Sequence, residues 1–404
     1  MGIIQKQSIR SSVFISLGFA IGAFNILLLF PRFLPPEYFG LTRAMLDIAL
    51  TLSLLCTVGS LPVIYKFFPF YNHYLTKEKN DLPLITGIVC VAGFILVMFG
   101  GWVFKDFIIR KLGKSPELAT YFYMIYPFTF FMLAFIWMES FSWGLKMTVI
   151  SNFLRETAVR IIGTILILLY GFRFISLHVF IHLFSLMYLV PAIILLMVLV
   201  RTRRWKIAIT WPSKVTRRLQ RRMISFGLFI FGAQFLNLLA KTNDTFLVFG
   251  IEGLAQTGVF AIATYMTAIM EIPQRSLNSI STPVLSESWK NNDLKNIEHV
   301  YRKSVTNLLV IALGLFGLIY LNAYNLASFL GKEYAQIGIV IFIMGFAKVI
   351  ELGTGINGII IGTSNYWKFD FYTNVFYTIF SLPLNFFLIK SFGLPGLAVA
   401  NLIS

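Results

Sequence analysis

Apolar stretches recur along the whole chain, and each is about 20 residues long, enough for a helix that crosses a hydrocarbon core of about 30 Å. Apolar residues make up 57% of the 404 residues and charged residues only 13%. Soluble domains do not have this composition. The stretches are continuous, which excludes a transmembrane β-barrel, because barrel strands alternate and last only about ten residues. The chain is therefore predicted to be an all-α, polytopic membrane protein.

About twelve transmembrane helices are predicted, and the last of them is incomplete. They cover residues 13–30, 41–65, 82–104, 118–143, 149–170, 177–200, 223–249, 254–272, 305–321, 336–361, 369–389 and a segment that begins near Leu394. The final segment stops at Ser404, so we expect either a truncated chain or a last segment that does not span. The first stretch lacks a small-residue cleavage site, and we therefore retain it as a span.

Positive charge is unequally distributed between the connections. Residues 201–222 contain nine Lys and Arg residues; the loops on the side of the N-terminus hold 20 of the 34, and those on the opposite side hold 8. Because basic loops stay in the cytoplasm, the N-terminus and this loop are predicted to be cytoplasmic. The net charge of +17 then reflects topology and not nucleic-acid binding, since no soluble domain would display it. Binding of anionic lipid head groups by the loop is left open.

The basic loop 201–222 divides the chain into an N-terminal lobe, 1–200, and a C-terminal lobe, 223–404, with six predicted helices each. Asn25 and Gly40 are fifteen residues apart at the first helical hairpin, and Asn243 and Gly258 repeat that spacing after the loop. The equal halves and this spacing suggest two pseudo-repeated six-helix lobes.

Charged residues inside the predicted spans are the candidate functional groups. The six cations are Arg43, Arg155, Arg160, Lys241, Arg275 and Lys348, and the six anions are Asp47, Glu139, Glu156, Asp244, Glu271 and Glu351. Nearly all form pairs three or four residues apart, which share one helical face, and Glu139 stands alone. A charge that faces acyl chains costs about 2.5 to 3.5 kcal/mol. We therefore expect these groups to line a hydrated central pathway.

Depth along the helices separates these charges into two predicted stations. At 1.5 Å per residue, Arg43, Asp47 and Lys241 fall in the outer half of the membrane, and most of the others fall in the middle or inner half. The alternative is that the pairs serve only as neutral contacts between helices. Because cations and anions are equal in number, this alternative stays open.

Residues 243–289, NDTFLVFGIEGLAQTGVFAIATYMTAIMEIPQRSLNSISTPVLSESW, resemble the oligosaccharide flippases of the multidrug/oligosaccharidyl-lipid/polysaccharide exporter superfamily. The opening LLLFPRFLPPEYFG, the segment FLRETAVR and the final GLPGLAVA look like the same group. The resemblance implies two six-helix lobes around a central cavity that opens alternately to each side. Many such proteins have fourteen helices, in which case this chain would lack the last ones.

The resemblance also implies a function. Such a protein moves a lipid-diphosphate-linked oligosaccharide from the inner to the outer leaflet of the bacterial inner membrane, for O-antigen, capsule or exopolysaccharide synthesis. The six cations would bind the diphosphate, and the six anions would balance them or couple transport to protons, Na⁺ or the membrane potential. The expected partners are membrane lipids, the lipid-linked glycan and glycan polymerase machinery. No enzyme activity, cofactor, metal or nucleic acid is expected.

Two other functions are kept as alternatives. A cation-coupled multidrug antiporter on the same fold would need a cavity dominated by acidic groups, whereas here the cations match the anions. A membrane glycan polymerase or ligase would need a large external loop, and the longest predicted one is only residues 105–117.

Overall fold

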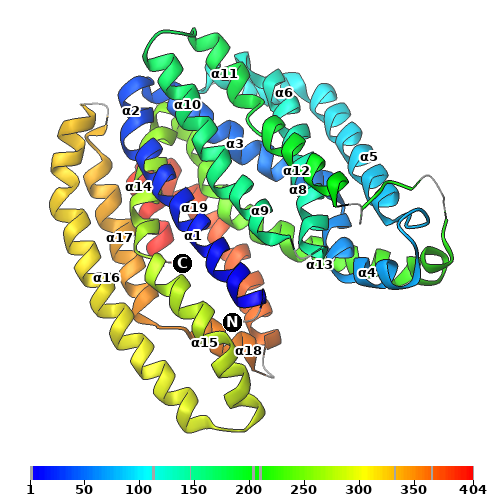
Figure 1. Ribbon diagram of the computed structural model, residues 1–404. Helices are drawn as coiled ribbons and strands as arrows, with labels where there is room; N and C mark the ends of the chain where they lie inside the picture. Colours follow the sequence, from blue (N-terminus) through cyan, green and yellow to red (C-terminus); the bar gives the residue numbers. More distant parts are fainter. Residues whose placement is uncertain are drawn as a thin grey trace. The chain divides into compact units, whose positions relative to one another are not determined.

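The computed structural model describes residues 3–111, 114–145, 147–202, 205–208, 212–331, 334–364 and 367–403, and within those ranges the chain forms helices joined by turns. It folds into two compact units, Met1–Thr242 and Asn243–Ser404 (Figure 1). The boundary lies inside the long helix α13 (Lys214–Leu247). The lobes that the sequence suggests, 1–200 and 223–404, stay a prediction.

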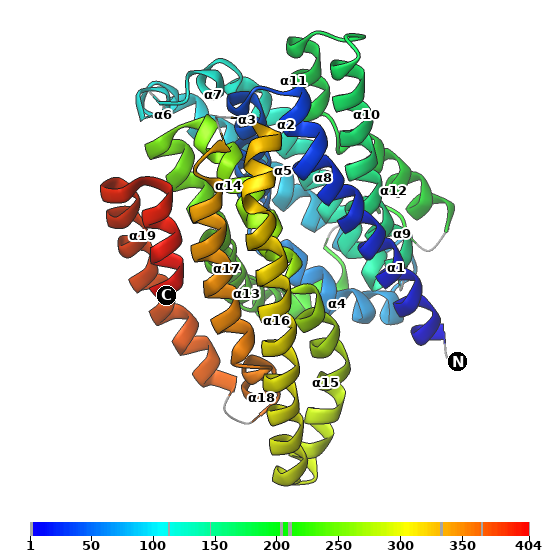
Figure 2. The same cartoon turned by 90° about the vertical axis from the view of Figure 1, so that its left-hand side faces the viewer.

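The first unit consists of antiparallel helices around buried aromatic rings. Its elements are α1 (Ile3–Phe24), η1 (Asn25–Leu29), α2 (Phe30–Phe33), α3 (Pro36–Thr57), α4 (Ser60–Tyr74), α5 (Leu82–Val103), α6 (Lys105–Lys111), α7 (Pro116–Thr120), η2 (Phe122–Met124), α8 (Ile125–Gly144), α9 (Thr148–Asn152), η3 (Phe153–Ala158), α10 (Val159–Gly171), α11 (Leu177–Ser185), α12 (Leu189–Arg201) and most of α13. Helices α2, α6, α7 and the start of α11 lie at one end of this unit, and the N-terminus and α4 lie at the other (Figure 2). Which of these two ends faces the cytoplasm stays a prediction.

The second unit is organised around α17 (Ile337–Gly353), which packs against α14, α16 and α19. Its elements are η4 (Val248–Glu252), α14 (Leu254–Ile269), α15 (Ile272–Lys290), α16 (Leu294–Leu330), α17, α18 (Asn357–Thr363) and α19 (Trp367–Ile403). Within α19, Gly393 has a φ of 64° and interrupts the helix. The interruption falls between the last two predicted spans.

Among the described residues, seven helical segments are long and apolar enough to cross a membrane, or eight if α17 and α18, bent by 46°, form one span. The other predicted spans also fall on helices. Residues 149–170 are divided among α9, η3 and α10, residues 223–249 lie on α13 and η4, and α14 is only 16 residues long. The chain is a multi-pass, all-α membrane protein.

The predicted continuous span 41–65 is wrong in one respect, because the chain breaks between α3 and α4. Val58 and Gly59 have φ angles of 43° and 81°, values that end a helix. A Cβ on Gly59 would collide with the backbone carbonyl of Gly227 on α13. The turn therefore lies where two backbones meet without side chains between them.

A buried carboxylate holds the start of α13 and explains why the second part of the predicted basic loop is helical. Asp81 is completely buried. Its Oδ2 accepts hydrogen bonds from Ser213 N at 2.7 Å and Thr216 Oγ1 at 2.8 Å. The buried Tyr71 hydroxyl lies 2.7 Å from the same Thr216 oxygen. A negative charge at a helix N-terminus is favourable, so Asp81 stabilises the helix that begins at Lys214.

We expect Asp81→Ala to lower the thermal stability of the purified protein. The change removes the carboxylate that accepts from the half-buried Ser213 N–H and from the Thr216 hydroxyl, and a group that is left unsatisfied costs about 1 to 3 kcal/mol. Thermal unfolding in detergent measures the effect, with Asp106→Ala on α6 as the control, because Asp106 is exposed. Equal melting temperatures for the two variants would contradict the assigned role.

Candidate functional site

Four charged side chains of the first unit form one connected group, ion cluster 1. Arg155 Nη1 lies 3.2 Å from Glu139 Oε2, and Arg155 Nε lies 3.2 Å from Glu156 Oε1. Arg160 Nη1 lies 2.8 Å from the second oxygen of Glu156. The cluster joins α8 to the η3–α10 segment, and its two cations match its two anions.

Exposure differs sharply within ion cluster 1. The Glu139 side chain is only 4% exposed, whereas that of Arg155 is 36% exposed. A buried carboxylate without a partner is strongly destabilising, so Glu139 fixes Arg155 in place. The guanidinium also lies 5.6 Å from the ring centroid of Trp143. Arg155 is therefore held from its buried side while part of it stays accessible to a ligand.

Ion cluster 1 is built on a π-helical turn. Arg155 and Glu156 belong to η3, and such turns are frequent at functional sites because they rotate side chains out of α-helical register. Helix α1 packs directly on this turn: a Cβ on Gly18 would collide with the carbonyl of Glu156. The buried Asn25 side chain donates to the Arg160 carbonyl at 3.0 Å. The contacts of α1 with the turn and of η1 with the start of α10 hold this segment in place.

Four charged side chains of the second unit form ion cluster 2. Lys348 Nζ lies 2.6 Å from Glu271 Oε1 and 2.6 Å from Glu351 Oε2. Arg275 Nη2 lies 2.9 Å from the other oxygen of Glu271. Glu351 is 52% exposed, whereas Glu271 and Lys348 are 24% and 26% exposed. Lys348 on α17 thus connects two acidic groups, one on its own helix and one between α14 and α15.

Asp244 forms a separate polar contact in the second unit. Its Oδ1 accepts a hydrogen bond from Asn385 Nδ2 at 2.7 Å, and its Oδ2 accepts one from Asn401 Nδ2 at 2.7 Å. Both amides belong to α19, on either side of the interruption at Gly393. Both oxygens of the Asp244 carboxylate thus accept a hydrogen bond from an amide, and these bonds connect Asp244 to both parts of α19.

The structure brings most of the predicted charges together. The predicted pairs Glu156–Arg160, Glu271–Arg275 and Lys348–Glu351 are confirmed as ion pairs. The prediction that Glu139 stands alone is wrong, because Arg155 reaches it across sixteen residues of sequence. Separation in sequence hid this contact, which only the packing of α8 against η3 creates.

The outer predicted station is less completely described. The Arg43 guanidinium carbon lies 5.6 Å from the ring centroid of Phe39, and its pairing with Asp47 stays a prediction. Lys241 lies on α13, but its side chain is outside the described part of the structure. Its predicted pairing with Asp244 is likewise untested.

Asn401 and Trp143 are two site residues that the sequence predictions missed. Asn401 lies in the last predicted segment, where nothing in the local pattern pointed to a partner. The indole of Trp143 donates to Ser151 at 3.1 Å, which fixes the ring beside Arg155. Neither contact has a signal in local sequence spacing.

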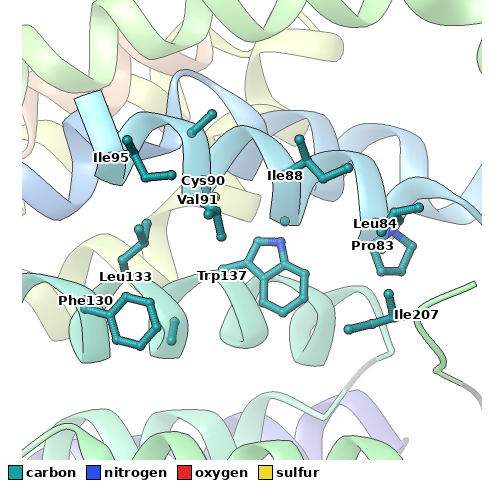
Figure 3. A pocket seen from close by; sticks show the side chains of 13 residues that line it. Pro83, Leu84, Ile88, Cys90, Val91, Ile95, Phe130, Leu133, Trp137 and Ile207 are labelled. Carbon is teal, nitrogen blue, oxygen red and sulfur yellow. The ribbon is translucent and has the colours of Figure 1, made fainter. Parts of the chain in front are cut away.

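The first unit also contains an apolar pocket. Figure 3 shows a pocket of about 570 Å³ between α5 and α8, into which Trp137 points. Its described lining is apolar, so these residues offer no charged group to an anionic head group. Among the described residues, no three or more His, Cys, Asp or Glu side chains lie close enough to hold a metal ion.

Comparison with solved structures places the fold among known transporters. An inward-facing multidrug resistance MATE family transporter of the MOP superfamily matches with a TM-score of 0.70 and 14% identity, over 97% of this chain and 95% of that one. The lipid II flippase MurJ in its inward closed conformation matches with a TM-score of 0.69 and 15% identity, over 98% of this chain and 84% of that one. At these identities the likeness concerns the fold.

Sequence comparison gives a closer assignment. The "Probable low-salt glycan biosynthesis flippase Agl15" of Haloferax volcanii is 26% identical over 151 residues, which is 37% of this chain and 32% of that protein. The aligned part thus spans about a third of the relative's length. The sequence pattern of the family described as "Polysaccharide biosynthesis protein" matches residues 8–289. This match covers well over half of the chain, which therefore belongs to the family of polysaccharide biosynthesis proteins.

Proposed function

We propose that this protein is a flippase, and not an enzyme, that moves a lipid-diphosphate-linked oligosaccharide from the inner to the outer leaflet of a bacterial inner membrane. Family membership supports the substrate class. The observation that carries the proposal is ion cluster 1, in which a buried Glu139 presents a partly exposed Arg155 on a π-helical turn.

The chemistry of the substrate explains why such a group is needed. A diphosphate cannot cross hydrocarbon unaided, whereas its lipid tail need not leave the membrane. Arg155 can contact phosphate oxygens through two parallel N–H groups, and a lysine such as Lys348 acts as a point charge. The substrate would displace an accessible carboxylate, Glu156 in the first cluster and Glu351 in the second. Buried Glu139 would stay bound to Arg155 throughout.

Exchange of a carboxylate for a phosphate gives a basis for alternating access. A ligand shifts a conformational equilibrium only when it interacts differently with the two states. Ion pairs that close the empty clusters would favour one state, and a bound diphosphate that replaces them would favour the other. Arg43, Lys241 and Asp47 complete the proposed path as an outer station.

The membrane potential supplies a driving force for this step. Two negative charges that move outward across about 100 mV, negative inside, gain roughly 4 to 5 kcal/mol. We also propose Asp244 as the group that couples transport to a proton or Na⁺, because it is a carboxylate whose two oxygens are held by the amides of Asn385 and Asn401.

A cation-coupled multidrug antiporter is the competing proposal on the same fold. Such a transporter would need an excess of acidic groups where its cationic substrate binds. Each ion cluster here contains two basic and two acidic side chains, so displacement of its one accessible carboxylate by phosphate leaves an excess of positive charge for an anionic head group.

Lys348→Gln is expected to slow translocation strongly in reconstituted vesicles. The change removes the cation that contacts both Glu271 and Glu351, so neither the closed cluster nor the phosphate contact can form. Transbilayer movement of a fluorescent lipid-diphosphate sugar is measured by quenching from outside. Arg302→Gln is the matched control, since Arg302 pairs with Glu298 at helical spacing but is 78% exposed. Translocation at the wild-type rate by Lys348→Gln would contradict the proposal. Drug-driven cation efflux by the wild type, without movement of the sugar, would contradict it as well.

A further inference from the structure

A groove in the first unit combines basic and aromatic side chains and takes no part in the proposed transport path. It lies between α4 and α13 and encloses about 690 Å³. We call it the α4–α13 groove and define it by Lys66, Phe70, Arg221, Arg222 and Phe229, all of which line it. Polar and apolar atoms both contribute to its surface.

Three cations lie along one part of the α4–α13 groove. Lys66 Nζ lies 3.9 Å from the ring centroid of Phe226, which holds the ammonium against the groove wall. Arg221 and Arg222 lie on α13 and are exposed. None of the ion pairs found among the described residues includes any of the three. The groove therefore presents concentrated positive charge, and the lining residues that the structure describes include no acidic side chain.

The other part of the groove is aromatic and exposed. Phe70 is 49% exposed and Phe229 is 69% exposed. Along α13 the sequence changes within a few residues from KVTRRLQRR to MISFGLFIFG. A helix with that change passes from a polar medium into an apolar one, and long basic side chains at the transition extend toward head groups. The groove thus lies at the level where a bilayer changes from head group to acyl chain.

We infer that the α4–α13 groove binds an anionic phospholipid, with its phosphate against Lys66, Arg221 and Arg222 and an acyl chain along Phe70 and Phe229. Charge complementarity selects an anionic head group over a zwitterionic one. The exposed rings select a ligand with an attached chain over free phosphate. Because both helices contribute, a bound lipid would stabilise the contact between α4 and α13.

The test is a binding titration of the full chain in detergent with phosphatidylglycerol and with phosphatidylcholine. At about fivefold for each cation removed, Arg221→Gln/Arg222→Gln should bind phosphatidylglycerol roughly 25-fold more weakly. Arg217→Gln/Arg218→Gln is the matched control: it removes the same charge from the same helix, at exposed positions outside the groove. This control should bind as the wild type does. Equal losses in the two double variants, or equal binding of the two lipids by the wild type, would overturn the inference.

A second variant separates a lipid from other phosphate ligands. Phe70→Ala should weaken binding of phosphatidylglycerol while it leaves binding of inorganic phosphate unchanged, because only the lipid uses the ring. Farnesyl diphosphate serves as the probe for a prenyl diphosphate. If the groove variants lose farnesyl diphosphate but keep phosphatidylglycerol, the groove belongs to the transported lipid and the inference is wrong. Circular dichroism and thermal unfolding verify that every variant is folded.

Discussion

Arg155→Gln should abolish translocation of a lipid-diphosphate sugar, and adding Glu139→Gln should restore stability without restoring translocation. In the single variant, Glu139 keeps its charge while only 4% exposed and loses the cation that lies 3.2 Å away. Removing one partner of a buried ion pair costs about 3 to 5 kcal/mol. The double variant replaces both charges with neutral amides, so no charge is left buried without a partner and the stability loss should largely disappear.

The double variant distinguishes a transport role from a structural one. If ion cluster 1 only connects α8 to η3, a neutral pair of amides should support both folding and transport. If Arg155 binds phosphate, the double variant should unfold at nearly the wild-type temperature and still fail to move the sugar. Thermal unfolding and the vesicle quenching assay give the two readouts on the same preparations. Translocation at the wild-type rate by the double variant would refute the proposed role of Arg155.

The control for this experiment keeps the local structure and changes a different charge. Arg110→Gln removes an exposed cation on α6, whose Nε donates to the backbone carbonyl of Asp106 at 3.3 Å. It should alter neither the unfolding temperature nor the translocation rate. A loss of transport in this variant as well would mean that the assay responds to net charge and not to the site.

The helical class and the local ion pairs could be predicted from the sequence because they depend on spacing along one helix. Apolar stretches of sufficient length identify spans, and charges four residues apart share a face. Glu156 with Arg160 and Glu271 with Arg275 both follow that rule and are confirmed. Each of these predictions needs no knowledge of which helices pack together.

The contacts between helices could not be predicted, because they depend on tertiary packing. Lys348 on α17 contacts Glu271, which lies between α14 and α15. Arg155 on η3 contacts Glu139 on α8. The breaks in the predicted spans could not be predicted either, because they depend on the backbone geometry at particular residues. Gly59 turns where it meets Gly227, and Gly355 takes a φ of 72° at the bend between α17 and α18. The position of such a glycine in the sequence does not tell whether the chain bends there or whether a neighbouring helix packs closely against it.

The π-helical turns are a further feature without a sequence signal. The first hairpin contains η1, which begins at Asn25, and the hairpin of the second unit contains η4. The fifteen-residue spacing from Asn25 to Gly40 recurs from Asn243 to Gly258, but η1 begins at Asn25 whereas η4 begins five residues after Asn243. The two π-helical turns therefore do not occupy the same place in the predicted repeat, and the two-lobe arrangement stays a prediction.

Asp244→Asn should remove the dependence of translocation on a cation gradient. The carboxylate accepts two amide hydrogen bonds, from Asn385 and Asn401, each at 2.7 Å. An asparagine at position 244 has one acceptor oxygen, so one of the three amides must turn, and the negative charge that would bind a proton or Na⁺ is lost. A cation that moves inward across about 100 mV contributes roughly 2.3 kcal/mol. The variant should lose the driving force that the cation supplies. It should keep the driving force that the membrane potential exerts on the charge of the substrate.

The measurement compares sugar movement in vesicles with a Na⁺ gradient, a proton gradient or a membrane potential imposed alone. Wild-type protein should respond to the potential and to one of the two cation gradients, whereas Asp244→Asn should respond to the potential only. Asp293→Asn is the matched control, because Asp293 caps the start of α16 by accepting from Asn296 N at 3.0 Å and lies outside the polar contact. Should Asp244→Asn keep the cation response of the wild type, the coupling carboxylate must be another residue. Since the substitution preserves shape, a loss confined to the cation arm identifies the missing charge, and not a packing defect, as its cause.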